Sequence, residues 1–142
     1  MINLFFGLGL MAICLLLQSV LMVLAIRHYS RRQAALQYSS FVSSLILVST
    51  IMMLLVLGNL AQLTLWGALF YALGEFSGMR DAIYHSAVNF ATLGYGDIVM
   101  SEKHRLLGPL EAINGVLMIG VSTAVLTAVF QDIIKNKMAK PA

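Results

Sequence analysis

The chain has 142 residues, of which 60% are hydrophobic and 11% are charged, whereas a soluble domain carries roughly 25% charged residues. This composition excludes an ordinary soluble globular protein. The net charge is +3, but most basic residues stand in two short clusters, so nucleic acid is not an expected partner. The single cysteine, Cys14, cannot form an intramolecular disulfide.

A first uncharged stretch opens the chain and ends at three arginines, Arg27, Arg31 and Arg32. Its apolar part has about the 20 residues that a bilayer requires. We therefore predict a first membrane-spanning helix over residues 4–26.

A second uncharged stretch covers residues 33–74, which as helix would measure roughly twice the hydrocarbon thickness. Gly58 and Asn59 could divide it, but each piece would then be too short to span alone. One helix over residues 41–73 is the favoured interpretation, with Trp66 and Tyr71 near its outer interface.

A third apolar stretch predicts a helix over residues 109–134, because Pro109 suits the first helical position. Glu111 is interpreted as a charge favoured by the dipole at the start of that helix. The remaining polar loop spans residues 75–105, in which His104 is expected to be solvated.

These stretches predict an all-α membrane protein that forms one domain over residues 1–142. Basic residues near membrane helices favour the cytoplasm, and here they fill the first loop and the C-terminal tail. We expect a multi-pass protein of the cell (inner) membrane with the N-terminus and the loop at 75–105 outside.

One motif stands inside that loop, and it reads Thr92-Leu93-Gly94-Tyr95-Gly96-Asp97. Glycine visits positive φ at little cost, so this pattern lets the backbone turn its carbonyl groups all one way. Carbonyl rings of this kind can replace the water around a dehydrated cation. Such irregular backbone is tolerated at membrane depth where it lines a cavity.

The segment resembles the selectivity filter of tetrameric potassium channels, whose signature is Thr-Val/Ile-Gly-Tyr/Phe-Gly-Asp, and Leu93 departs from the commonest form. The resemblance implies a homotetrameric pore in the lipid bilayer, no enzyme activity, K⁺ as the permeant ion and no organic cofactor; a regulatory partner is unknown. It also implies K⁺ ligands from the filter residues Thr92, Leu93, Gly94, Tyr95 and Gly96, of which the first four supply the ion-binding rings.

The flanks extend this resemblance. Residues 79–97 look like a pore helix running into its filter, between an outer helix (41–73) and an inner helix (109–134); residues 4–26 add a helix that the two-helix pore module lacks.

Individual residues near the filter have expected roles. Tyr84 stands where many relatives carry a Trp that bonds the Asp after the filter, so Tyr84 and Asp97 are expected to support the filter through a hydrogen bond. Gly120 is a possible gating hinge, with Gly115 as the competing candidate, and close helix packing is the alternative for either. His85 could tune the filter with pH or simply pack as a neutral residue.

Two other function classes stay open. A non-selective or Na⁺-conducting channel would be favoured by the loss of Tyr95 or Gly96, and both are present. A transporter or accessory subunit would use paired broken helices, whereas one interrupted segment is visible. An enzyme has almost no support, because no catalytic constellation is evident.

Overall fold

The computed structural model describes residues 2–36 and 41–138, and it is all-helical over those residues. The helices are α1 (Ile2–Leu36), α2 (Phe41–Ala72), α3 (Met79–Phe90) and α4 (Leu107–Met138). Three of them contain segments long and apolar enough to cross a membrane, namely Leu4–Arg32, Val42–Ala72 and Leu107–Lys135. The predicted all-α membrane class with three spanning helices is confirmed.

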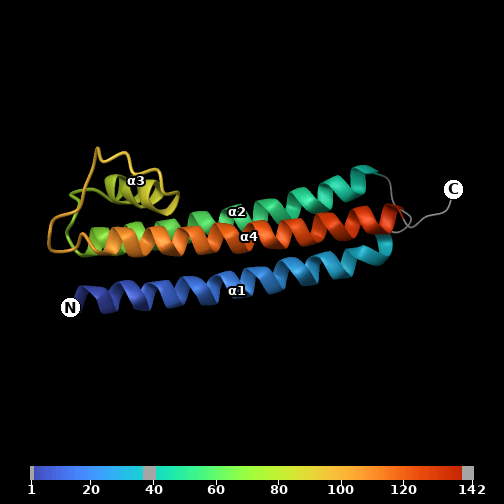
Figure 1. Cartoon of the computed structure of the whole chain (residues 1–142), viewed down its shortest axis with the longest axis horizontal. Coiled ribbons are helices and arrows are strands. Elements are labelled where there is room, and N and C mark those ends of the chain that lie inside the picture. The colour runs from blue at the N-terminus through green and yellow to red at the C-terminus, as the bar shows by residue number, and fades with distance from the viewer. Residues whose placement is uncertain (1, 37–40, 139–142) are drawn as a thin grey trace.

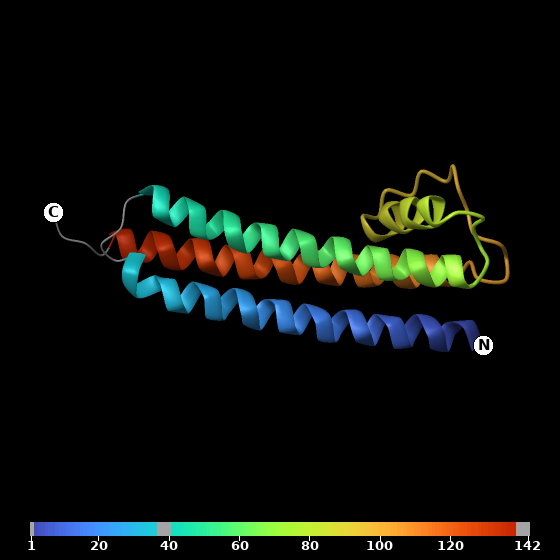
Figure 2. The same cartoon turned by 180° about the vertical axis from the view of Figure 1, so that it is seen from behind.

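The three long helices lie side by side, and α3 packs with its loop against one end of the bundle (Figure 1). Seen from behind, α3 covers α2 and α4 on the side away from α1 (Figure 2). We call the end that carries α3 the loop end, and the opposite end, where α1 finishes and α2 begins, the turn end. The helix α1 begins at the loop end (Figure 1).

The helices differ in extent from the sequence prediction. α1 continues past residue 26 through the arginine cluster to Leu36, because the cluster contains no helix breaker. α2 runs unbroken through Gly58 and Asn59. A Cβ atom on Gly58 would lie 2.2 Å from Leu21 Cδ1, so this glycine lets α1 approach α2 closely. α4 begins at Leu107, which leaves Pro109 in the first turn, where a missing backbone N–H breaks no helical hydrogen bond.

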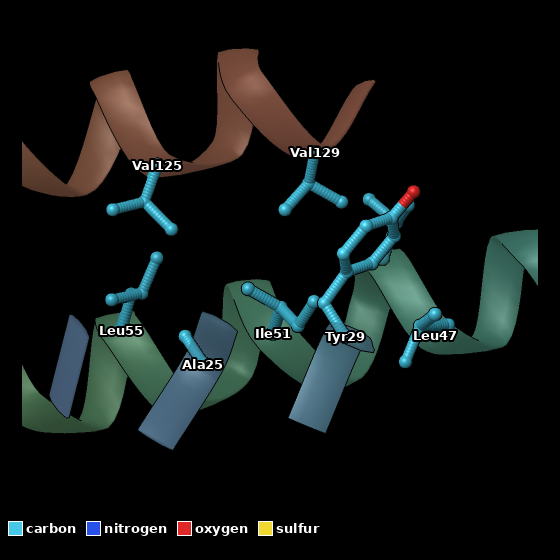
Figure 3. Close-up of a cluster of buried hydrophobic side chains, with 8 residues drawn as sticks. Ala25, Tyr29, Leu47, Ile51, Leu55, Val125 and Val129 are labelled. Carbon is cyan, nitrogen blue, oxygen red and sulfur yellow. The ribbon is translucent and has the colours of Figure 1, made fainter. Parts of the chain in front are cut away.

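The buried apolar side chains form two clusters. At the turn end, Val125 and Val129 of α4 face Ile51 and Leu55 of α2 (Figure 3). The complete turn-end cluster consists of Ala25, Tyr29, Leu47, Val48, Ile51, Leu55, Val125 and Val129. The loop-end cluster consists of Cys14, Trp66, Phe70, Ala82, Phe90, Leu107 and Met118. Trp66 is fully buried there, so it packs inside the bundle, and its expected place near the outer interface stays a prediction.

Between the two clusters, a polar network joins α1 to α2 and α4. Gln62 Nε2 donates to Gln18 Oε1 at 2.8 Å, and Gln18 Nε2 donates to Ser122 Oγ at 2.9 Å. All three side chains are buried. Amide side chains that hydrogen-bond across helices are a recognised means of association in a bilayer. This network attaches the additional first helix to the other two.

Candidate functional site

The TLGYGD segment (residues 92–97) directly follows α3 at the loop end. The helix ends in a pair of backbone hydrogen bonds: Thr92 N donates to Asn89 O at 2.9 Å, and Leu93 N donates to Val88 O at 2.8 Å. This pair is the Schellman motif, which places a left-handed residue just after the C-cap. The residue in that position is Thr92, with φ of 57°.

A threonine at positive φ is an outlier, because its branched side chain disfavours the left-handed region. Strain of this kind costs on the order of 1–3 kcal/mol and persists where the surroundings fix it. The helix-ending hydrogen bonds supply that restraint at Thr92. The sequence motif gave no sign of it, because glycine, not threonine, is the usual residue there.

Positive φ then recurs at every second residue. Gly94 has φ of 61° and Gly96 has φ of 72°, whereas Leu93 and Tyr95 between them do not have positive φ. A Cβ atom on either glycine would meet no heavy atom within 4 Å. Within one chain, conformation and not crowding is therefore the reason for glycine at these two positions. This alternation is the backbone form that the motif predicts.

The TLGYGD segment is exposed in the single chain. Leu93 is 54% exposed and Tyr95 is 66% exposed, although both are large apolar or aromatic side chains. An open cavity of about 440 Å³ lies beside the segment, and its lining includes Asn89, Thr92 and Gly94. One chain therefore leaves the segment without an enclosing wall.

The structure brings Tyr84 and Asp97 together. The Tyr84 hydroxyl donates to Asp97 Oδ2 at 2.7 Å, and the amide of Ile98 donates to Asp97 Oδ1 at 3.0 Å. The hydrogen bond from Tyr84 holds the pKa of Asp97 below its ordinary value. The same bond raises the pKa of Tyr84. The contact links α3 to the residue that ends the TLGYGD segment, and its supporting role remains a prediction.

His85 holds the chain just beyond the segment. Its Nδ1 lies 2.9 Å from Ile98 O, and its Nε2 lies 2.9 Å from Asn89 Nδ2. A carbonyl accepts and an amide nitrogen donates, so both bonds form when the ring is neutral with its proton on Nδ1. Burial lowers the pKa of His85, which favours that neutral form. His85 thus combines the packing role with a specific hydrogen bond.

The back of α3 is docked tightly on its neighbours through Ile83, Ser86 and Phe90, which lie on one face of the helix; we call them the docking face. A Cβ atom on Gly67 of α2 would lie 2.9 Å from Ile83 Cα, and one on Gly115 of α4 would lie 2.1 Å from Phe90 O. Two glycines therefore permit backbone contact on both sides of α3.

Ser86, in the middle of the docking face, makes polar contacts with both neighbours. Ser86 Oγ lies 2.5 Å from the Leu63 carbonyl oxygen of α2, and it is hydrogen-bonded to Glu111 Oε1 of α4. Both side chains are fully buried. The interpretation of Glu111 as an ordinary helix-start charge is therefore wrong, because helix packing encloses its carboxyl group.

A second polar cluster ties the loop to the end of α2. Glu75 accepts hydrogen bonds from Ser101 N at 2.6 Å and Ser101 Oγ at 2.7 Å, and it pairs with His104 Nδ1. Burial raises the pKa of Glu75, but the hydrogen bonds from His104 and Ser101 outweigh it and leave the pKa below its ordinary value. His104 is buried, so the expectation that it is solvated is wrong.

The two candidate hinge glycines have different surroundings. Gly115 is the close-packing glycine described above, in contact with the end of α3. A Cβ atom added to Gly120 would meet no heavy atom of the same chain within 4 Å. Close packing against α3 therefore explains why residue 115 is glycine. No such packing explains Gly120, which stays the candidate hinge.

Sequence reasoning found the TLGYGD segment and the Tyr84 contact, but it missed Glu75 and Ser86 and gave Glu111 a different role. One signal was available for Glu111, since it stands four residues before Gly115 and thus on the same helix face. Over the described residues, no group of three or more His, Cys, Asp or Glu side chains could hold a metal ion.

Comparison with known proteins gives one match. A family model described as an ion channel matches residues 62–132, which is half of the chain. The matched region runs from α2 through α3 and the TLGYGD segment into α4, and it leaves α1 outside. No curated protein and no solved structure matches the chain.

Proposed function

The chain belongs to the ion channel family, and on that premise we propose that it is a potassium-selective channel that works as a homotetramer. K⁺ would pass down its electrochemical gradient through a filter made of the TLGYGD segments of four copies.

The observation that carries this proposal is the alternation of positive φ at Thr92, Gly94 and Gly96. Alternating backbone conformation allows successive carbonyl groups to face one side, where they can replace the hydration shell of a cation. The carbonyl groups of Thr92, Leu93, Gly94 and Tyr95 are the proposed ligands, with the Thr92 hydroxyl as a further ring.

Assembly is part of the proposal because one chain has one such segment, and that segment is exposed. A dehydrated cation needs ligands on all sides, so several copies must surround it. The number four comes from the resemblance of the motif to tetrameric potassium channels. The exposed Leu93 and Tyr95 side chains and the open cavity beside them would be covered by neighbouring copies.

The proposed orientation follows from the basic residues. Arg27, Arg31 and Arg32 near the end of α1 would face the cytoplasm with the C-terminal tail. The N-terminus and the loop end would then lie outside the cell membrane. Cysteine substitutions at Asn3 and Lys137 in a Cys14→Ser background test this with an impermeant thiol reagent, and labelling of position 137 from outside intact cells would overturn it.

The test of function is ion flux through the purified protein in liposomes, with K⁺ and Na⁺ gradients compared. We expect K⁺ flux to exceed Na⁺ flux strongly in the wild type. Gly96→Ala should abolish the difference or the assembly, because alanine at φ of 72° costs roughly 1–2 kcal/mol in each copy.

Gly9→Ala is the matched control. Gly9 lies in the helix α1 and has no heavy atom within 4 Å of an added Cβ, so this variant should conduct like the wild type. Equal K⁺ and Na⁺ flux through the wild type would contradict K⁺ selectivity and indicate a non-selective cation channel. A monomer or trimer by native mass spectrometry would overturn the tetramer.

A further inference from the structure

If Glu111 is charged, Ser86 on the back of α3 has too few protons for its two hydrogen bonds. Ser86 Oγ carries one hydrogen, and it lies against two acceptors, the Leu63 carbonyl oxygen at 2.5 Å and Glu111 Oε1. A backbone carbonyl has no proton to donate, and neither has a carboxylate. With an ionised Glu111, one of these two oxygen pairs would have no hydrogen between them.

The environment of the second carboxyl oxygen agrees with this count. Glu111 is 0% exposed, and its Oε2 has no hydrogen-bond partner among the described residues. No salt bridge joins Glu111 to a lysine or arginine in the part of the chain that the structure describes. A buried carboxylate without a cation is far more costly than a neutral carboxylic acid.

We propose that Glu111 is a neutral carboxylic acid that donates its proton to Ser86 Oγ, and that this bond positions α3 behind the filter. Ser86 then donates its own proton to the Leu63 carbonyl oxygen. The resulting chain of two hydrogen bonds joins α4 to α3 and α3 to α2. It rests on the proposed function in one respect, namely that the segment following α3 is a selectivity filter.

The geometry of the docking face explains why this contact has a positioning role. Ser86 lies between Ile83 and Phe90, the two residues where Gly67 and Gly115 allow backbone contact. Glycine contacts set how closely α3 approaches its neighbours but leave it free to slide along them. A hydrogen bond is directional, so Glu111 fixes the position of α3 along α2 and α4.

The same position determines where the filter begins. The Schellman bonds join Thr92 and Leu93 to the last turn of α3, so a shift of α3 moves the first filter residues with it. Glu111 is thus a positioning residue for the filter and contacts no ion itself. Its effect on selectivity passes through Ser86.

Infrared spectroscopy of the protein in lipid tests the protonation state without any need for conduction. We expect a C=O stretching band of a protonated carboxylic acid in the wild type at neutral pH, lost in Glu111→Gln. Glu102→Gln is the matched control, because Glu102 is exposed in the loop, and it should leave that band unchanged. An unchanged band in Glu111→Gln would overturn the assignment, whatever the flux.

Ion selectivity tests the positioning role. Glutamine keeps the shape and can donate to Ser86, so Glu111→Gln should retain the K⁺ to Na⁺ permeability ratio. Glu111→Ala and Ser86→Ala should each lower this ratio roughly tenfold, the equivalent of one lost hydrogen bond, and the double variant should fall no further. Failure of glutamine to rescue, or additive losses, would overturn the positioning role. A wild type without K⁺ selectivity, together with a band lost in Glu111→Gln, would overturn the filter and its positioning but leave the neutral acid established.

Discussion

Each end of the bundle has a cluster of buried apolar side chains, but the two ends differ in the polar contacts beside it. At the loop end, α3 and its loop are fixed by directional hydrogen bonds: Tyr84 to Asp97, His85 to Ile98 and Ser101 to Glu75. At the turn end, the helices meet mainly through the apolar cluster of Figure 3, to which the Tyr29 hydroxyl adds a hydrogen bond to Asp132 at 2.5 Å.

This difference predicts where the molecule can change shape. Hydrogen bonds lose most of their energy when their geometry changes, whereas apolar contact is non-directional and depends mainly on area. The helices at the turn end can therefore shift relative to one another at lower cost than α3 can. We expect a rigid loop end, with any gating motion at the turn end, beyond Gly120.

The largest effect should come from Gly115→Ala. The new Cβ would lie 2.1 Å from the carbonyl oxygen of Phe90, which is a backbone atom that cannot move aside without displacing α3. We expect a loss of about 3 kcal/mol or more in stability. The fluorescence of Trp66, the only tryptophan and fully buried in the loop-end cluster, reports the unfolding.

Gly120→Ala is the control for that prediction. Its Cβ would meet nothing within 4 Å in the same chain, so the stability of the fold should change by less than about 1 kcal/mol. Equal destabilisation by the two substitutions would contradict the assignment of Gly115 as the packing glycine.

The next largest effect concerns Glu75 and the stability of the fold at low pH. Its pKa is lowered in the folded chain, so the folded state favours the carboxylate. This stabilisation is fully present above the ordinary glutamate pKa of 4.5, and it is lost as the pH falls through the lower folded value. Glu75→Gln should lower stability at neutral pH by about 2 kcal/mol, because hydrogen bonds to a charged acceptor are lost.

Thermal unfolding followed against pH checks the Glu75 prediction. In Glu75→Gln, the loss of stability below pH 4.5 should be smaller than in the wild type. The part that remains comes from Asp97, whose pKa is also lowered. The lowered pKa of His85 adds a separate loss of stability that begins as the pH falls below about 6.5. The reason is that the unfolded chain binds a proton at His85 before the folded chain does. An identical decline in wild type and Glu75→Gln would contradict the role of Glu75.

A smaller effect is expected in the middle of the bundle. Gln18→Leu removes the bonds to Gln62 and Ser122 and leaves their polar groups buried, so we expect a loss of about 1–2 kcal/mol. Ser19→Ala is the control, because among the described residues the Ser19 hydroxyl bonds only the Leu15 carbonyl oxygen of its own helix, at 2.8 Å. The resistance of α1 to limited proteolysis measures how firmly it is attached to α2 and α4. Equal resistance in both variants would contradict the role of the polar network in that attachment.

The smallest structural changes remove a single hydroxyl group, and we expect them to alter channel opening. Tyr84→Phe deletes one hydroxyl at the loop end, and Tyr29→Phe deletes one at the turn end. We expect Tyr84→Phe to shorten single-channel open times severalfold through faster filter collapse, with the tetramer intact. Tyr29→Phe should leave the filter unaffected and instead favour opening, because it removes one hydrogen bond between α1 and α4. Wild-type open times in Tyr84→Phe would show that its bond to Asp97 is irrelevant to the filter.

Local sequence is sufficient to predict the membrane-spanning helices and the TLGYGD segment. Both depend on local properties: the length of an uncharged run against the thickness of a bilayer, and glycine at positions that need positive φ. The Tyr84 contact could also be predicted, but from the resemblance to potassium channels, because Tyr84 stands where many of them carry a Trp that bonds the Asp after the filter.

The tertiary structure alone decided which polar residues are buried and what they bond. Apolar residues surround each long helix, so periodicity gives no sign of which face packs. The burial of Glu111, its contact with Ser86, the pairing of His104 with Glu75 and the different surroundings of Gly115 and Gly120 therefore all depend on the relative rotation of distant helices. That rotation is fixed by how three helices and α3 fill space together, which no local stretch of sequence specifies.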